Sequence, residues 1–168
     1  MRSLSWLTGF APIHSAHITH LVLGSFPSET SLAQQQYYGH PQNQFWRLMG
    51  AILNEPLAAL PYEKRVQALL NNHIGLWDVY SGCERSGSLD SAIRMGELNP
   101  LDRLFEHAPA IRYVAFNGKA AAKAGLPHIP EHVHTETLPS SSPAYTLSFD
   151  KKLQLWQQFF DLQHRKDV

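Results

Sequence analysis

The sequence contains one cysteine, Cys83, among 168 residues. A single thiol excludes an intramolecular disulfide, a zinc site built from several cysteines and a four-thiolate iron–sulfur cluster. It also fits a protein kept in a reducing compartment. We therefore expect no iron–sulfur cluster.

Neither sign of charge is in excess, because 14 lysines and arginines balance 14 aspartates and glutamates. The chain lacks the overall basic charge of many DNA-binding domains, although acidic residues elsewhere can offset a local basic patch. Its 43% hydrophobic and 17% charged residues are typical of a folded protein and exclude a charged, disordered tail protein. The length predicts one domain over residues 1–168.

Long hydrophobic runs are also missing. No apolar stretch approaches the ~20 residues that span a bilayer, and the first residues lack the apolar core of a signal peptide. The sequence therefore predicts a cytoplasmic protein without a membrane partner.

Signatures of several enzyme classes are absent. No Gly-x-Gly-x-x-Gly follows the first predicted strand and no Gly-Lys-Ser/Thr occurs, which disfavours nucleotide-dependent oxidoreductases and NTPases. The histidines at 14, 17 and 20 and at 132 and 134 do not form a His-Glu-x-x-His motif, and no Gly-x-Ser-x-Gly elbow surrounds a serine. We expect neither a metal nor a cofactor.

Strand-like and helix-like segments alternate along the chain. Four apolar, β-rich runs predict strands at residues 18–23, 74–80, 111–116 and 133–138. Helices are predicted from Asn43 onward, over 61–72, from the cap Asn99 through His107, over 119–124 and over about 149–162. Segments 25–41 and 81–98 are predicted to be long connections. This order is typical of an α/β fold, a parallel sheet with helices on both faces.

Two loops at the carboxyl ends of predicted strands have unusual compositions. Ligands of parallel α/β sheets bind at these ends. Residues 24–28 combine a glycine and a proline with two serines, and residues 138–144 hold three serines between two prolines. The serine hydroxyls and free backbone N–H groups of the second loop can bind a phosphate, and both loops are also consistent with ordinary turns.

The segment from Tyr37 to Trp46 is rich in aromatic and amide side chains. Phe45 and Trp46 are predicted core anchors of the following helix. Asn43 stands at the helix entrance, where it can cap the helix or serve as a neutral amide that positions a water molecule.

Together, these segments resemble the uracil-DNA glycosylase superfamily, and within it the hypoxanthine-DNA (deoxyinosine) glycosylase family, which is related to mismatch-specific uracil and thymine DNA glycosylases. The matching segments, in order, are residues 24–28, 40–46, 74–78, 116–119 and 138–142. The resemblance spans residues from about 18 to 160. It implies a three-layer sandwich around a four-stranded, mainly parallel sheet.

Two positions depart from the wider superfamily. Many members carry Asp or Asn two positions after the glycine of the first motif, where this chain has Phe26, and the histidine of classical uracil-specific enzymes is Leu138 here. The hypoxanthine family shares the first departure and relies on the asparagine of the second segment. The resemblance therefore implies that Asn43 is catalytic.

The resemblance also implies a monomeric enzyme that removes a deaminated base, hypoxanthine first, from DNA during base excision repair. It assigns base binding to Phe26, Tyr38, His40, Asp78 and Asn117. The motif-one loop comprises Gly24, Ser25, Pro27 and Ser28. Phosphate contact or insertion into DNA is assigned to Pro139, Ser140, Ser141, Ser142 and Pro143, with the insertion wedge extending to Tyr145.

Three alternatives stay open: a uracil or mismatch-specific glycosylase, a catalytically silent nucleic-acid-binding module of the same fold, and a hydrolase of free nucleosides. The neutral charge predicts a small DNA footprint with modest salt dependence. It also predicts that basic residues gather on the cleft face. The candidates are Arg47, Arg85, Arg94, Lys119 and Lys123.

Overall fold

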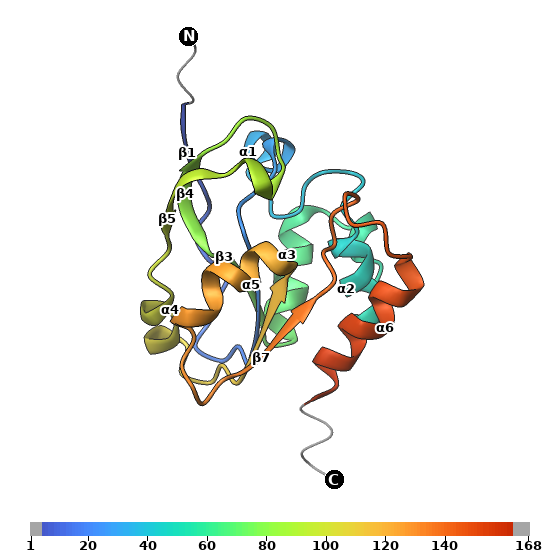
Figure 1. Ribbon diagram of the computed structural model, residues 1–168. Coiled ribbons are helices and arrows are strands. Elements are labelled where there is room, and N and C mark those ends of the chain that lie inside the picture. Colours follow the sequence, from blue (N-terminus) through green and yellow to red (C-terminus); the bar gives the residue numbers. More distant parts are fainter. Residues whose placement is uncertain (1–4, 163–168) are drawn as a thin grey trace.

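The computed structural model describes residues 5–162 and shows an α/β fold built around a central parallel sheet (Figure 1). The sheet has four strands in the order β3-β2-β6-β7. Their bounds are His20–Gly24 for β2, Ile74–Asp78 for β3, Tyr113–Asn117 for β6 and His134–Leu138 for β7. Each strand overlaps the run that predicts it, and the expected four-stranded parallel sheet is confirmed.

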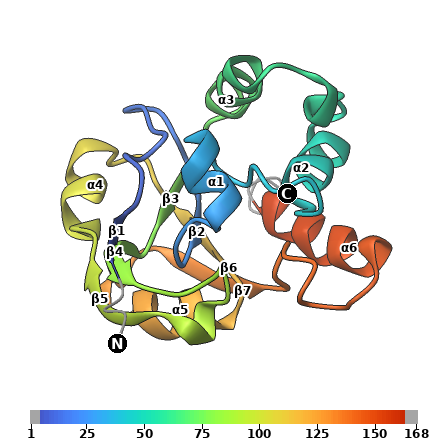
Figure 2. The same cartoon turned by 90° about the horizontal axis from the view of Figure 1, so that it is seen from above.

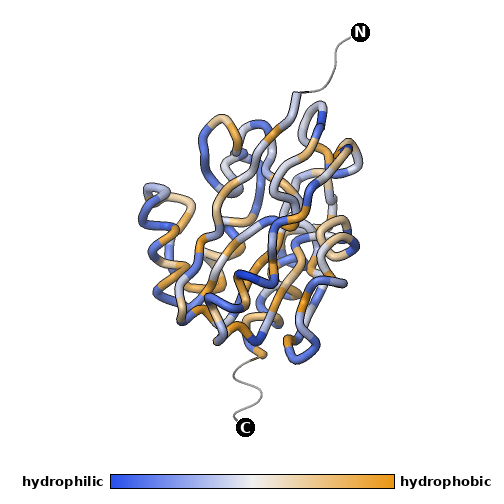
Figure 3. The backbone as a smooth tube through the Cα atoms, turned by 90° about the vertical axis from the view of Figure 1, so that its left-hand side faces the viewer, coloured by the Kyte–Doolittle hydropathy of each residue, from blue (hydrophilic) through white to orange (hydrophobic). Residues whose placement is uncertain are grey.

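Helices cover both faces of this sheet, as expected for three layers (Figure 2). One face packs against α2 (Phe45–Leu53), α3 (Tyr62–Asn71) and α6 (Phe149–Phe160), and the other against α4 (Leu101–His107) and α5 (Lys119–Gly125). Apolar and polar stretches alternate along the chain (Figure 3), because each helix buries only one side. Among the described residues, no helix is long and apolar enough to cross a membrane.

The core is aromatic on the face that carries α2 and α6. Trp156 of α6 and Phe45 of α2 are fully buried, and their ring centroids lie 5.9 Å apart. Phe45 also stacks on Tyr38, with 4.1 Å between the centroids. The predicted anchoring role of Phe45 and Trp46 is thus confirmed, since both are buried. This cluster holds the start of α2 beside the sheet.

The strand register brings four strand ends to one edge. Gly24 of β2 is paired with Asp78 of β3, and Asn117 of β6 is paired with Leu138 of β7. Because the strands are parallel, the loops that leave these positions emerge together.

The segment 81–98, predicted to be a connection, instead supplies most of a second sheet. This sheet is antiparallel, with β1 (Trp6–Thr8), β4 (Tyr80–Glu84) and β5 (Arg94–Leu98) in the order β1-β4-β5. Its strands mix polar residues and glycines with a few apolar ones, and every residue of β5 is exposed, Met95 and Leu98 included, so no alternation of apolar residues marks the sheet. Tyr80, predicted to end the preceding strand, begins β4.

The other predicted connection, 25–41, contains helix α1 (Glu29–Gln34). The hydroxyl of Ser28 accepts a hydrogen bond from the backbone N–H of Ser31, which caps the helix, and Glu29 stands in the first turn. A serine cap followed by an acidic residue is a helix-start signal that could have found α1. Three short 3₁₀ turns complete the fold: Leu57–Ala59, Asp90–Ala92 and Leu126–His128.

The predicted cap at Asn99 is wrong. Helix α4 begins after Pro100, which occupies the cap position, and no side chain caps its N–H groups. Asn99 instead donates its Nδ2 hydrogen to the carbonyl of Asp78, 2.7 Å away. The side chain of Asn99, which the local sequence assigns to the helix cap, therefore makes a tertiary contact with β3 instead.

Gly75 in β3 provides a test of the sheet packing. A Cβ atom there would lie 2.6 Å from Ile18 Cδ1 and 2.7 Å from the carbonyl oxygen of Ile13, which is held by its bridge to Leu76. We expect Gly75→Ala to lower the free energy of unfolding by about 1–3 kcal/mol, as overpacking does. Urea denaturation measures the change, with Ser86→Ala in an exposed loop as the control. Equal stability of the glycine variant and the wild type would contradict the packing described.

Candidate active site

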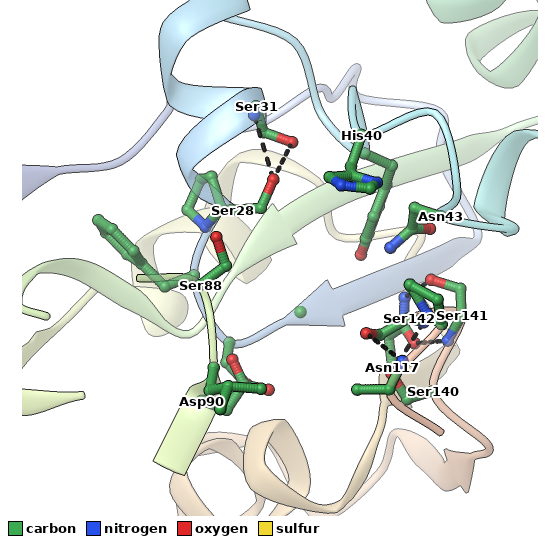
Figure 4. A pocket seen from close by; sticks show the side chains of 18 of the residues that line it. Ser28, Ser31, His40, Asn43, Ser88, Asp90, Asn117, Ser140, Ser141 and Ser142 are labelled. Carbon is green, nitrogen blue, oxygen red and sulfur yellow. Dashed lines mark hydrogen bonds between the residues drawn. The ribbon is translucent and has the colours of Figure 1, made fainter. Parts of the chain in front are cut away.

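The loops from the carboxyl ends of the sheet enclose a cavity of about 510 Å³ (Figure 4). Fourteen sequence-predicted site residues line it: Gly24, Ser25, Phe26, Pro27, Ser28, Tyr38, His40, Asn43, Asp78, Asn117, Ser140, Ser141, Ser142 and Pro143. Tyr145, the end of the predicted wedge, also lines it. Pro139 does not; its carbonyl accepts a hydrogen bond from Trp156 Nε1, 2.8 Å away.

The cavity also has lining residues that sequence reasoning missed. Ser31 belongs to α1, and Ser88, Leu89, Asp90 and Ser91 belong to the connection between β4 and β5. No motif points to them, because both elements lie in segments predicted only to be long connections. In Figure 4, Ser88 and Asp90 lie across the cavity from Ser140, Ser141 and Ser142.

The motif-one loop begins at Gly24, where no side chain fits. A Cβ atom would lie 2.6 Å from Asp78 Oδ1 and 3.0 Å from the Tyr38 hydroxyl. The glycine therefore allows the carboxyl and the phenol to approach the end of β2 closely. Ser31 then links this loop to the next segment, because its hydroxyl contacts that of Ser28 and accepts the N–H of Gly39.

Phe26 is buried, with an exposed fraction of 7%, and lies against Arg85. The guanidinium carbon is 5.2 Å from the ring centroid, a cation–π arrangement. Arg85 is itself buried and donates hydrogen bonds to the carbonyls of Pro27 and Gly87. The aromatic ring is thus held in place on the cavity wall.

Asn43 lies at the entrance of α2. Its Oδ1 accepts the backbone N–H of Phe45 at 2.9 Å, so the capping interpretation is correct in substance, although Gln44 holds the formal cap position. This contact also determines which way the amide faces. The oxygen points to the helix and the nitrogen points toward the cavity (Figure 4). One side chain therefore serves the helix and presents N–H donors to the cavity.

Asn117 and Ser141 form a reciprocal pair. Asn117 Nδ2 donates to Ser141 Oγ, and the Ser141 N–H donates to Asn117 Oδ1, both at 2.9 Å. The carbonyl of Ser141 accepts the N–H of Gln44, also at 2.9 Å. Ser141 is consequently buried, with 1% of its surface exposed. Both polar atoms of the Asn117 amide bind Ser141, so this side chain holds the serine loop in place.

Helix α6 holds the same loop from its other side. Lys152, fully buried, donates from Nζ to the carbonyl of Ser142 at 3.2 Å, and its ammonium lies 5.6 Å from the ring centroid of Tyr145. Trp156, one turn later, donates to Pro139. The serine loop is therefore a fixed structure rather than a free surface turn.

Two carboxyl groups share the opposite wall. Asp78 is buried and its Oδ2 has no hydrogen-bond partner among the described residues. Burial, together with the nearby charge of Asp90 and against the opposing effect of Arg85, raises the pKa of Asp78 to about 7. Desolvation also raises the pKa of Asp90, although its Oδ2 accepts a hydrogen bond from Ser25 Oγ at 3.2 Å.

The basic residues predicted to gather on the cleft face do not line the cavity itself, and their gathering on the surrounding face stays a prediction. None of the five candidates is among the lining residues of the cavity: Arg47 lies over Phe149 at 4.4 Å, and Arg85 lies behind Phe26. The cation attached to the serine loop is Lys152, which sequence reasoning missed because a helical lysine is normally a solvated residue.

The raised pKa of Asp78 makes a prediction about stability. A carboxyl whose folded pKa exceeds its unfolded value of 3.8 loses stabilisation as the pH rises from about 4 to about 7. The shift sets an upper limit of about 4 kcal/mol on this loss. We expect Asp78→Asn to exceed the wild type in unfolding free energy at pH 8 by at least about 1 kcal/mol, and by less at pH 5. Denaturation at both pH values measures this, with the exposed Asp102→Asn as the control, and a pH-independent difference would contradict it.

Comparison with known proteins agrees with this geometry. The family model for the uracil DNA glycosylase superfamily matches residues 11–162. Proteins named hypoxanthine DNA glycosylase from Methanosarcina barkeri and Methanosarcina acetivorans are 38% and 39% identical over 152 residues, which cover 90% of this chain and 96% of each relative. A solution NMR structure from Methanosarcina acetivorans, named as a candidate uracil DNA glycosylase, has a TM-score of 0.84 at 38% identity and covers 93% of this chain and 97% of its own. On this evidence, the chain belongs to the uracil DNA glycosylase superfamily.

Proposed function

We propose that this protein is a DNA glycosylase that hydrolyses the N-glycosidic bond of deoxyinosine and releases hypoxanthine, the first step of base excision repair. The observation that carries the proposal is the cavity itself. It is a pocket at the strand ends that presents an amide from Asn43 and a carboxyl from Asp78, in a chain whose relatives are named hypoxanthine DNA glycosylase. We propose that it acts as a monomer in the cytoplasm, without a cofactor or an iron–sulfur cluster.

The reaction breaks the bond between C1′ of deoxyribose and N9 of the purine. The bonding electron pair leaves with the base while C1′ gains oxocarbenium character, and a water oxygen then forms the new bond to C1′. The water loses one proton and the departing purine gains one, so the products are an abasic site and neutral hypoxanthine. Stabilising the leaving base and positioning the water are therefore the two tasks of the site.

Asn43 suits the second task. Its N–H donors face the cavity and its orientation is held by Phe45, so it can fix the oxygen of a water molecule beside C1′. A neutral amide does not remove the proton of that water. Consequently, stabilisation of the departing base must lower much of the barrier, at about tenfold in rate for each 1.4 kcal/mol.

Asp78 suits the first task. At its raised pKa, a large share of the carboxyl is neutral near pH 7, and a neutral carboxyl offers one O–H donor and one acceptor. Hypoxanthine presents the matching groups side by side, because its N1–H donates and its O6 accepts. The N3–H and carbonyl groups of uracil have the same chemistry, so uracil is the natural second substrate to test.

The remaining predicted residues surround these two groups. The held ring of Phe26 can stack on an extruded base, and Tyr38 and His40 form part of the wall. Asn117 acts through Ser141 and is a positioning residue. Ser140 and Ser142 are the serines left to contact phosphate, with Pro143 to Tyr145 beside them.

The first test is cleavage of oligonucleotide duplexes that carry deoxyinosine, uracil or xanthine, followed by alkaline cleavage at abasic sites. We expect release of hypoxanthine and no action on undamaged adenine. Retained DNA binding without cleavage of any substrate would instead favour the catalytically silent module. Action on free inosine alone would favour a nucleoside hydrolase.

The second test removes the amide of Asn43. We expect Asn43→Ala and Asn43→Ser each to lower single-turnover excision by at least ~100-fold, which corresponds to about 3 kcal/mol. Serine keeps a hydrogen-bond acceptor for the N–H of Phe45, so loss of activity in that variant is not a consequence of helix uncapping. Gln42→Ala, an exposed neighbour, is the matched control. Full activity in a folded Asn43→Ser protein would refute the assignment.

A further inference from the structure

We infer that Leu89 inserts into the DNA base stack when the damaged nucleotide is extruded, from the rim of the cavity opposite the serine loop. The inference rests on the proposed function and adds a second DNA-inserting residue, on a loop that no motif identifies. Three observations carry it: which exposed apolar residues border the cavity, how the loop of Leu89 is held, and where that loop lies.

Few exposed apolar side chains stand at the cavity. The structure exposes seven large hydrophobic residues in its described part: Trp6, Leu89, Met95, Leu98, Leu126, Tyr145 and Leu155. Of these, only Leu89, 60% exposed, and Tyr145, 45% exposed, line the cavity. A single exposed leucine needs no explanation by itself. One that borders a predicted DNA-binding pocket, whose lining also includes an exposed tyrosine on another loop, does.

The loop that carries Leu89 is tied to the motif-one region on both sides of it. Ser88 Oγ accepts the N–H of Glu29 at 3.0 Å, and Asp90 Oδ2 accepts the hydroxyl hydrogen of Ser25 at 3.2 Å. Behind them, the buried Arg85 donates to the carbonyl of Gly87 at 2.8 Å. The residues on both sides of Leu89 are therefore held, and the side chain of Leu89, 60% exposed, extends into solvent.

This arrangement suits insertion into DNA. An exposed apolar side chain is removed from water when it enters a base stack, which is favourable. Little conformational entropy is lost on insertion, because the backbone that carries the side chain is already fixed. Leucine is one of the residues that serve as wedges between base steps. Removing a nucleotide from the duplex costs a few kcal/mol and leaves a gap that such a wedge can fill.

The position of the loop completes the argument. Ser88 and Asp90, which flank Leu89, lie across the cavity from the serine loop that leads to Tyr145 (Figure 4). A nucleotide that enters the cavity therefore passes between the two rims. Leu89 on one rim and Tyr145 on the other can then occupy the space that the nucleotide vacates.

The first experiment compares two duplexes in single-turnover excision: deoxyinosine paired with cytosine, and deoxyinosine opposite an abasic-site analogue, where extrusion costs less. We expect Leu89→Ala to lower the ratio of the first rate to the second by at least ~10-fold, and Leu89→Met to restore it. Leu126→Ala, at an exposed leucine (51%) outside the cavity lining, serves as the control and should leave the ratio unchanged. An unchanged ratio in Leu89→Ala, including one that results from an equal loss of rate on both duplexes, would overturn the inference.

The second experiment separates this inference from the proposed function. 2-Aminopurine beside deoxyinosine reports unstacking by its fluorescence, and the Asn43→Ser protein binds without requiring turnover. We expect fluorescence to rise on binding and most of that rise to disappear when Leu89→Ala is added. If the wild type excises no base but the rise still depends on Leu89, the proposed function fails and the insertion stands. A rise that is independent of Leu89 overturns the insertion whatever the activity.

Discussion

The shape of the site depends on the pair of hydrogen bonds between Asn117 and Ser141. This contact joins the end of β6 to the serine loop, and the carbonyl of Ser141 then accepts the N–H of Gln44 at the entrance of α2. Three elements that are distant in sequence thus meet at one buried serine. Because Asn43 is adjacent to Gln44, the same contact sets where the proposed water-positioning amide stands relative to the loop that would hold phosphate. Buried hydrogen bonds of this kind are costly to leave unmade, which keeps the arrangement unique.

On the opposite wall of the cavity, a buried polar group lacks, within the described part of the chain, the hydrogen bonds that the serine loop has. There the protein buries the carboxyl of Asp78 beside Asp90, with Arg85 as the neighbouring cation, and leaves Asp78 Oδ2 without a partner among the described residues. Such a group costs stability whenever it ionises. Perturbed pKa values of this sort are common at functional sites. In the proposed function, a bound base supplies a hydrogen bond to this carboxyl.

Much of the fold could be predicted because the central sheet is buried. Its strands β2, β3 and β6 are buried throughout and therefore appear as uninterrupted apolar runs. The antiparallel sheet could not be predicted, because β5 is exposed and β4 contains Gly82, which faces the ring of Trp6. Helix α1 was missed because it is short and depends on contacts from Ser31 to Gly39 as much as on its own sequence. Asn99 illustrates the same limit, since a carbonyl on β3 displaces its expected role as a cap.

For the site, the order of residues along the chain establishes which residue types stand at the ends of the strands. Gly24, Asp78 and Asn117 each follow an apolar run, and Asn43 opens a helix. Local order in a chain is enough to establish that. The tertiary structure alone decided what each side chain does there. It turned Asn117 toward Ser141, directed the nitrogen of Asn43 to the cavity, placed Asp90 near Asp78, and brought Lys152 beneath the serine loop. The physical reason is that hydrogen bonding and pKa depend on which groups meet in space and how far water is excluded from them, and neither is encoded in the spacing of residues along the chain.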